Sequence, residues 1–147
     1  VSRLYIMMGH LLQGQADIFS EELQQFILQL VSVYDAANKE SFYHGFMLGM
    51  TALFLGKDYT VESNRESGYG RFDLAIIPKD VSKAGVIMEF KVADREADME
   101  EKAKEALQQI EEREYVTEFR QRGIQRVWKY GIAFCGKKIL AFQGPMC

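Results

Sequence analysis

Two apolar runs that contain charged residues constrain the fold of this chain more than any other feature. The run from 72 to 77 contains Asp73, and the run from 86 to 92 contains Glu89 and Lys91. Side chains alternate between the faces of a strand, so Glu89 and Lys91 share one face of the second run. Burying charged groups in such strands is unfavourable unless they pair with one another or bind a metal ion. The pattern therefore predicts a functional site on two strands. The simpler alternative is that Asp73 and Glu89 lie in solvent on edge strands, with Lys91 as their salt-bridge partner.

Composition places few other limits on the chain. With 147 residues, of which 48% are apolar and 27% charged, it is long enough to form one globular domain with a real core. Its two cysteines, Cys135 and Cys147, form neither a disulfide framework nor a zinc pattern. No apolar run approaches the roughly 20 residues of a membrane span, and the start does not resemble a signal peptide. We expect a soluble, cytoplasmic protein. A chain that begins at Val1 is expected to be processed or cut from a longer one.

The charge is unevenly distributed along the chain. The formal net charge is -3, yet the segment from residue 119 to the end has six basic residues and no acidic one. Such a segment predicts a cationic surface, which either follows a phosphate backbone or balances the acidic remainder of the protein. The six are Arg120, Arg122, Arg126, Lys129, Lys137 and Lys138.

Hydrophobic periodicity predicts the order of helices and strands. Two short helical patterns occupy the first 35 residues, the second with Ser20 as its N-cap, and a third helix runs from about 39 to 55. Strands are expected at 59–63, 72–77, 86–92, 127–134 and 138–142. One long helix from about 94 to 122 separates the third strand from the fourth. We divide the chain into an N-terminal helical extension, 1–37, and a main domain, 38–147.

This order resembles the PD-(D/E)xK nuclease superfamily, because an acidic residue lies in the second strand and an E-x-K triplet, 89–91, in the third. The stretches 63–73, 76–79 and 87–91 look like the nuclease-like domain found C-terminal to AAA-type ATPase domains. Residues 42–46 and 106–110 also look like that family, and Phe72 replaces the proline of the superfamily name. The resemblance implies an α/β (α+β) fold with a restriction-endonuclease-like core: a central mixed sheet of four to five strands flanked by helices.

The resemblance also implies metal-dependent hydrolysis of phosphodiester bonds. Asp73 and Glu89 would supply the hard oxygen ligands that Mg²⁺, or Mn²⁺ in its place, prefers, and Glu40 would be a further ligand. Lys91 would orient or deprotonate the attacking water and stabilise charge in the transition state. His44, one turn after Glu40, is expected to be a hydrogen-bonded packing residue rather than a ligand.

Gln109 resembles the glutamine that some branches of the superfamily place near the metal site. Lys102 and Arg113 share its flank of the helix. Exonuclease-like branches have a tyrosine one turn beyond this glutamine, where this chain has Arg113, and Tyr115 is expected to lie elsewhere. Further candidate substrate contacts flank the turn before Asp73, namely Arg65, Tyr69 and Arg71.

Three functional hypotheses follow. The first is a nuclease whose substrate is nucleic acid, with DNA favoured over RNA and with no membrane partner. The second is a non-catalytic module that binds nucleic acid or regulates a partner, which predicts binding that weakens steeply with salt. The third is a structural or oligomerising domain attached to an AAA-type ATPase through the N-terminal helices.

Overall fold

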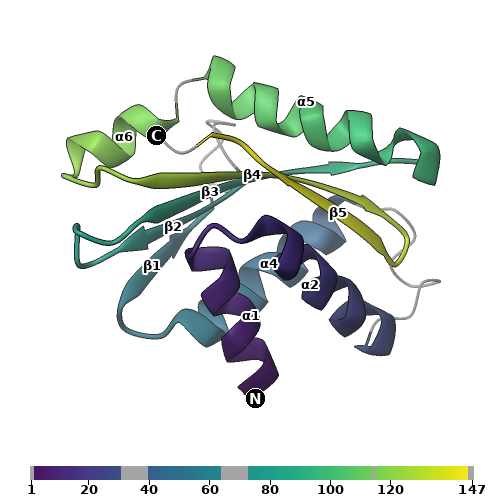
Figure 1. Ribbon diagram of the computed structural model, residues 1–147, viewed down its shortest axis with the longest axis horizontal. Coiled ribbons are helices and arrows are strands. Elements are labelled where there is room, and N and C mark those ends of the chain that lie inside the picture. The colour runs from purple at the N-terminus through teal and green to yellow at the C-terminus, as the bar shows by residue number, and fades with distance from the viewer. Residues whose placement is uncertain (1, 31–39, 64–72, 114, 146–147) are drawn as a thin grey trace.

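A five-stranded mixed sheet lies between two layers of helices (Figure 1). The computed structural model describes residues 2–30, 40–63, 73–113 and 115–145. Within these, the strands follow one another across the sheet in chain order, β1-β2-β3-β4-β5. Their bounds are Tyr59–Glu62 for β1, Leu74–Pro78 for β2, Gly85–Val92 for β3, Val127–Cys135 for β4 and Lys138–Gln143 for β5.

Only one neighbouring pair in this sheet is parallel. β3 and β4 run in the same direction, with Glu89 opposite Gly131, whereas the other three pairs are antiparallel hairpin neighbours. Parallel neighbours need a long crossover connection, usually a helix. The segment between β3 and β4 provides it and crosses one face of the sheet (Figure 1).

Three helices of the described residues cover the other face of the sheet, and they share one core with the strands (Figure 1). They are α1, Ser2–Leu12, α2, Ala16–Leu30, and α4, Glu40–Leu55. Tyr43 of α4 stacks on Phe134 with ring centroids 4.4 Å apart, and the Tyr130 hydroxyl donates a hydrogen bond to the Leu11 carbonyl at 2.6 Å. The expected boundary after residue 37 falls within 31–39, outside the described residues, so the division of the chain stays a prediction.

The beginning of α2 was predicted wrongly. Ser20 lies inside the helix, which starts at Ala16. The Ala16 amide lies within hydrogen-bonding distance of the Gln143 side-chain oxygen, at 3.4 Å, so a residue far along the chain helps to satisfy this helix start. A local N-cap signal cannot reveal such a partner.

The crossover contains a broken helix rather than the single helix expected over 94–122. It consists of the 3-10 turn η1, Glu96–Asp98, then α5, Met99–Glu112, and then α6, Val116–Gln121. In one continuous helix Phe119 would point about 180° away from Ile110, because nine residues make two and a half turns. Both side chains are buried in the same cluster against the sheet, and the break after Glu112 makes this possible.

The basic residues of the C-terminal third do not form one surface. Arg126 lies before β4, and Lys137 and Lys138 lie at the β4–β5 turn, about 30 Å away along a nine-residue strand. Arg122 pairs with Glu62 at 3.1 Å, and Lys129 is buried and pairs with Glu111. These positions agree better with basic residues that balance nearby acidic groups than with one continuous surface that binds a phosphate backbone. No described helix has the length and apolar character needed to cross a bilayer.

Candidate active site

The two strand carboxylates lie opposite each other on the sheet face that α5 covers. Asp73 directly precedes β2, and the antiparallel register that pairs Leu74 with Met88 places it beside Glu89 of β3. Both side chains are buried, with exposed fractions of 7% for Asp73 and 5% for Glu89. The alternative of carboxylates in solvent on edge strands is therefore wrong, since β2 and β3 are interior strands.

Backbone and side-chain contacts fix the position of Asp73. Its Oδ2 accepts a hydrogen bond from the Phe90 amide at 2.8 Å. The imidazole of His44, on α4, lies on the other side of this residue: its Nε2 is 2.9 Å from the Asp73 carbonyl oxygen and 2.8 Å from Ser63 Oγ. His44 is thus a hydrogen-bonded packing residue that ties α4 to the ends of β1 and β2, as expected.

Glu89 has an unusual electrostatic environment. Burial raises the pKa of its carboxyl to about 9, the neighbouring Asp73 carboxylate contributes in the same direction, and the positive charges of Lys91 and Arg113 only partly oppose them. Its Oε2 accepts a hydrogen bond from Gln109 Nε2 at 2.9 Å. Its Oε1 is buried and has no hydrogen-bond partner in the described part of the chain. Such a buried oxygen calls for a partner outside the described residues, such as a water molecule or a cation.

Gln109 links the carboxylate to the lysine. Its amide nitrogen donates to Glu89, and its amide oxygen accepts a hydrogen bond from Lys91 Nζ at 2.9 Å. The hydrogen-bond donor and the acceptor of this side chain are both used, which fixes the orientation of the amide. The three residues therefore form one network across β3 and α5.

A glycine on β4 allows α5 to approach the sheet closely enough for this network. A Cβ atom on Gly131 would lie 2.3 Å from the Ala103 carbonyl oxygen and 2.9 Å from the Leu107 amide nitrogen. The α5 backbone therefore rests directly on β4, next to Glu89. Any larger residue at this position would push the helix outward and carry Gln109 away from its partners.

The helix break brings Tyr115 into the site, which corrects the expectation that it lies elsewhere. Its side chain is buried, with 2% of its surface exposed, and it hydrogen-bonds to Gln109. Arg113 caps the end of α5, and its Nη1 is 3.4 Å from the Tyr115 hydroxyl. Burial raises the pKa of Tyr115. Spacing on a continuous helix could not reveal this residue, because the chain turns between Gln109 and Tyr115.

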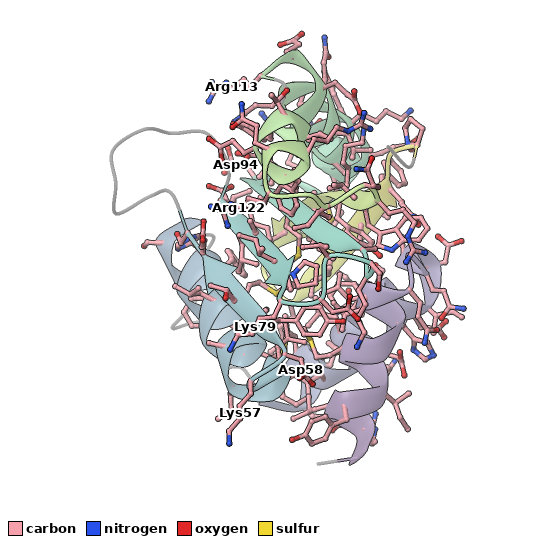
Figure 2. The ribbon with its side chains drawn as sticks, turned by 90° about the vertical axis from the view of Figure 1, so that its left-hand side faces the viewer. Lys57, Asp58, Lys79, Asp94, Arg113 and Arg122 are labelled. Carbon is pink, nitrogen blue, oxygen red and sulfur yellow. The ribbon has the colours of Figure 1, made fainter. Side chains whose placement is uncertain are left out.

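A hollow of about 290 Å³ lies beside α5, and the site borders it through Lys91 and Gln109. Figure 2 shows Arg113 in the α5 layer, on the outer side of the molecule. Lys91 and Gln109 line the hollow at its inner end, and the side chains at its rim are of mixed charge: Glu105, Gln108, Glu112 and Arg113.

The remaining predicted site residues are only partly placed. Lys102 pairs with Glu105 on α5 at 3.5 Å and does not line the hollow. Glu40 is the first residue of α4, but its side chain lies outside what the structure describes. The described residues contain no group of three or more metal-ligating side chains, so the third carboxylate ligand stays a prediction. Three further candidates also lie outside the described residues, namely Arg65, Tyr69 and Arg71.

A five-stranded mixed sheet flanked by helices, with a buried acidic pair and a lysine on neighbouring strands, defines an α+β protein with one candidate site. The family model of the PD-(D/E)XK nuclease superfamily matches residues 38–143, and the chain belongs to this superfamily. The sheet and its flanking helices agree with the restriction-endonuclease-like core of the family. Membership suggests phosphodiester hydrolysis of the nuclease type, and members usually use divalent metal ions. Neither the curated proteins nor the solved structures give a match.

Proposed function

We propose that the protein is a metal-dependent nuclease that hydrolyses phosphodiester bonds in nucleic acid, with DNA favoured over RNA. One observation carries the proposal: Asp73 and Glu89 are buried side by side, and Gln109 connects Glu89 to Lys91. Two adjacent buried carboxylates are unfavourable in a stable core unless a cation or a proton compensates them. Their burial beside a lysine that Gln109 holds in place supports a catalytic role.

The residues fit a divalent cation such as Mg²⁺ or Mn²⁺. Asp73 and Glu89 would hold it, because hard cations prefer carboxylate oxygens and the buried Glu89 Oε1 has no hydrogen-bond partner among the described residues. Glu40 is proposed as a further ligand. The bound cation would polarise the phosphate and lower the pKa of a coordinated water.

The side chains around the carboxylates have distinct roles in this proposal. Lys91 holds its ammonium group toward the hollow, where it hydrogen-bonds to a phosphate oxygen or takes a proton from water. Gln109 positions Lys91 and Glu89 relative to each other. Arg113, at the rim, contacts the substrate backbone as a bidentate phosphate ligand.

The substrate must tolerate a rim that is partly acidic. Glu105 and Glu112 lie beside Arg113 around the hollow, and they disfavour a polyanion that contacts this side closely. We therefore propose that Arg113 and Lys91 make the phosphate contacts on this side, and that Arg65, Tyr69 and Arg71, which lie outside the described residues, are further candidate contacts. The link to an AAA-type ATPase and the cytoplasmic location stay predictions.

A calorimetric titration of Mn²⁺ into the metal-free protein tests the proposal most directly. Binding should be present in the unmodified protein, lost in Asp73→Asn and Glu89→Gln, and unchanged in Glu21→Gln, which removes an exposed carboxylate on α2. Cleavage of single- and double-stranded DNA and RNA then identifies the substrate. Metal binding that survives both site substitutions would refute the metal site, and salt-sensitive nucleic-acid binding without cleavage would favour the non-catalytic module.

A further inference from the structure

A second hollow lies at the end of the sheet where β3 and β4 begin. Its volume is about 470 Å³, within the range of small-molecule pockets. The chain contributes to it from α1, from the start of β1, from the β2–β3 turn and from the start of β4. Ala84, in its wall, lies five residues before Glu89, about 16 Å along the strand, so this hollow is separate from the candidate active site. Figure 2 views this end of the molecule, where Lys79 and Asp58 mark two neighbouring turns.

Two cationic side chains lie in the wall of this hollow. The Arg126 Nη2 donates a hydrogen bond to the Ser82 carbonyl at 2.7 Å, which holds the guanidinium group in place and leaves its other donors for a ligand. Lys83 lies beside it in the wall. No carboxylate is among the described residues of the wall. The nearby Asp80 interacts with Lys83, but its Oδ1 accepts hydrogen bonds from the Ser82 amide and hydroxyl at 3.0 and 2.7 Å.

Aromatic side chains form another part of the wall. Trp128 and Tyr59 both border the hollow, and each is partly exposed. The indole is fixed in position because Gly14, with φ of 75°, lies directly against it: a Cβ there would be 2.6 Å from the ring atoms. A fixed aromatic surface beside an arginine and a lysine suits a ligand with a planar ring and an anionic group.

We propose that this hollow binds a nucleotide unit, with the base against Trp128 and the phosphate at Arg126 and Lys83. The unit is either a free nucleoside monophosphate or the phosphorylated end of a nucleic-acid strand, since both present the same ring and phosphate. The site is independent of the proposed nuclease activity, because it shares no residue with the carboxylate network.

Tryptophan fluorescence tests this site selectively, because Trp128 is the one tryptophan of the chain. AMP is titrated into the protein in EDTA, beside adenosine and inorganic phosphate as separate probes. We expect saturable quenching by AMP at a lower concentration than either fragment requires. Arg126→Gln and Lys83→Gln should each weaken AMP binding about tenfold, the effect of losing one charge-assisted hydrogen bond. Lys104→Gln, which removes an exposed lysine on α5, should bind as the unmodified protein does.

The same titration separates the two sources of the ligand. A 5′-phosphorylated dinucleotide that binds at least tenfold tighter than AMP identifies a strand end, whereas equal binding identifies a free nucleotide. Glu89→Gln should bind AMP normally, so a failure of the nuclease proposal leaves this result intact. The inference is overturned if AMP gives no saturable change in fluorescence or in calorimetry, or if Arg126→Gln binds AMP unchanged while its circular dichroism shows a folded protein.

Discussion

Replacing Glu89 with glutamine should stabilise the metal-free protein at neutral and alkaline pH. The reason is that the fold holds the pKa of this carboxyl at about 9, well above the ordinary value of 4.5. Between these two values the folded protein keeps a proton that the unfolded chain has lost. The free energy of unfolding therefore falls as pH rises through this window, by about 1.4 kcal/mol per pH unit for this one group. Glutamine is neutral at every pH, so the free energy of unfolding of the variant does not fall with pH at this position.

The magnitude follows from the size of the pKa shift. At pH 7 the unmodified protein is 2.5 pH units above the ordinary value of 4.5, so the variant should be more stable by at most about 3.5 kcal/mol. Near pH 4.5 the two proteins should be about equally stable. The glutamine side chain keeps an oxygen for the hydrogen bond from Gln109, so no partner is lost.

Urea unfolding in EDTA at pH 5, 6, 7 and 8 measures this difference. The stability gap between Glu89→Gln and the unmodified protein should widen with pH, whereas Glu21→Gln, on the exposed side of α2, should show no such trend. A gap that stays constant or narrows as pH rises would refute the reasoning. With saturating Mn²⁺ the sign should reverse, because a cation bound by the Glu89 carboxylate favours its charged form.

Three other substitutions test the site separately. Lys91→Ala should leave Mn²⁺ binding nearly intact and remove cleavage, whereas Asp73→Asn should weaken both; calorimetry and a cleavage assay decide, and equal activity in all proteins contradicts the assignment. Gln109→Ala leaves Lys91 Nζ and Glu89 Oε2 without their shared partner and should lower the unfolding free energy by about 1–3 kcal/mol in urea. Gly131→Ala should cost about 1–3 kcal/mol by pushing α5 away from β4, and it should reduce cleavage too; an unchanged melting temperature would show that the helix is not held there.

The strands could be predicted from the sequence because their signal is local. Alternation placed Glu89 and Lys91 on one face of β3, and the structure has Val86, Met88 and Phe90 packed in the core on the other. The expected helix over 94–122 was correct in its first part, since α5 buries Met99, Ala103, Ala106 and Ile110 at helical spacing. The order of the strands was therefore predictable from apolar periodicity, and the superfamily from the resemblance that Asp73 and the E-x-K triplet carry.

The features that the sequence did not reveal depend on residues far apart in the chain. Ser20 has the properties of an N-cap, but α2 begins earlier, where Gln143 from the last strand lies near the helix start. The break after Glu112 brings Tyr115 to Gln109, and no strong breaker residue in the described sequence marks it. Nothing in the sequence near Lys129 indicates that it is buried, because its partner Glu111 lies on the crossover between β3 and β4.

The single parallel pair in the sheet has a consequence for the order of folding. β1, β2 and β3 are antiparallel neighbours in chain order, so their contacts are more local than the pairing of β3 with β4 across residues 93–126. Because local contacts cost less loop-closure entropy, we expect β3 and β4 to pair later, and this pairing provides the surface on which α5 rests. A chain that ends before Val127 should retain both carboxylates without the network around them, so a ribosome-bound fragment of that length should be inactive until synthesis proceeds past β4.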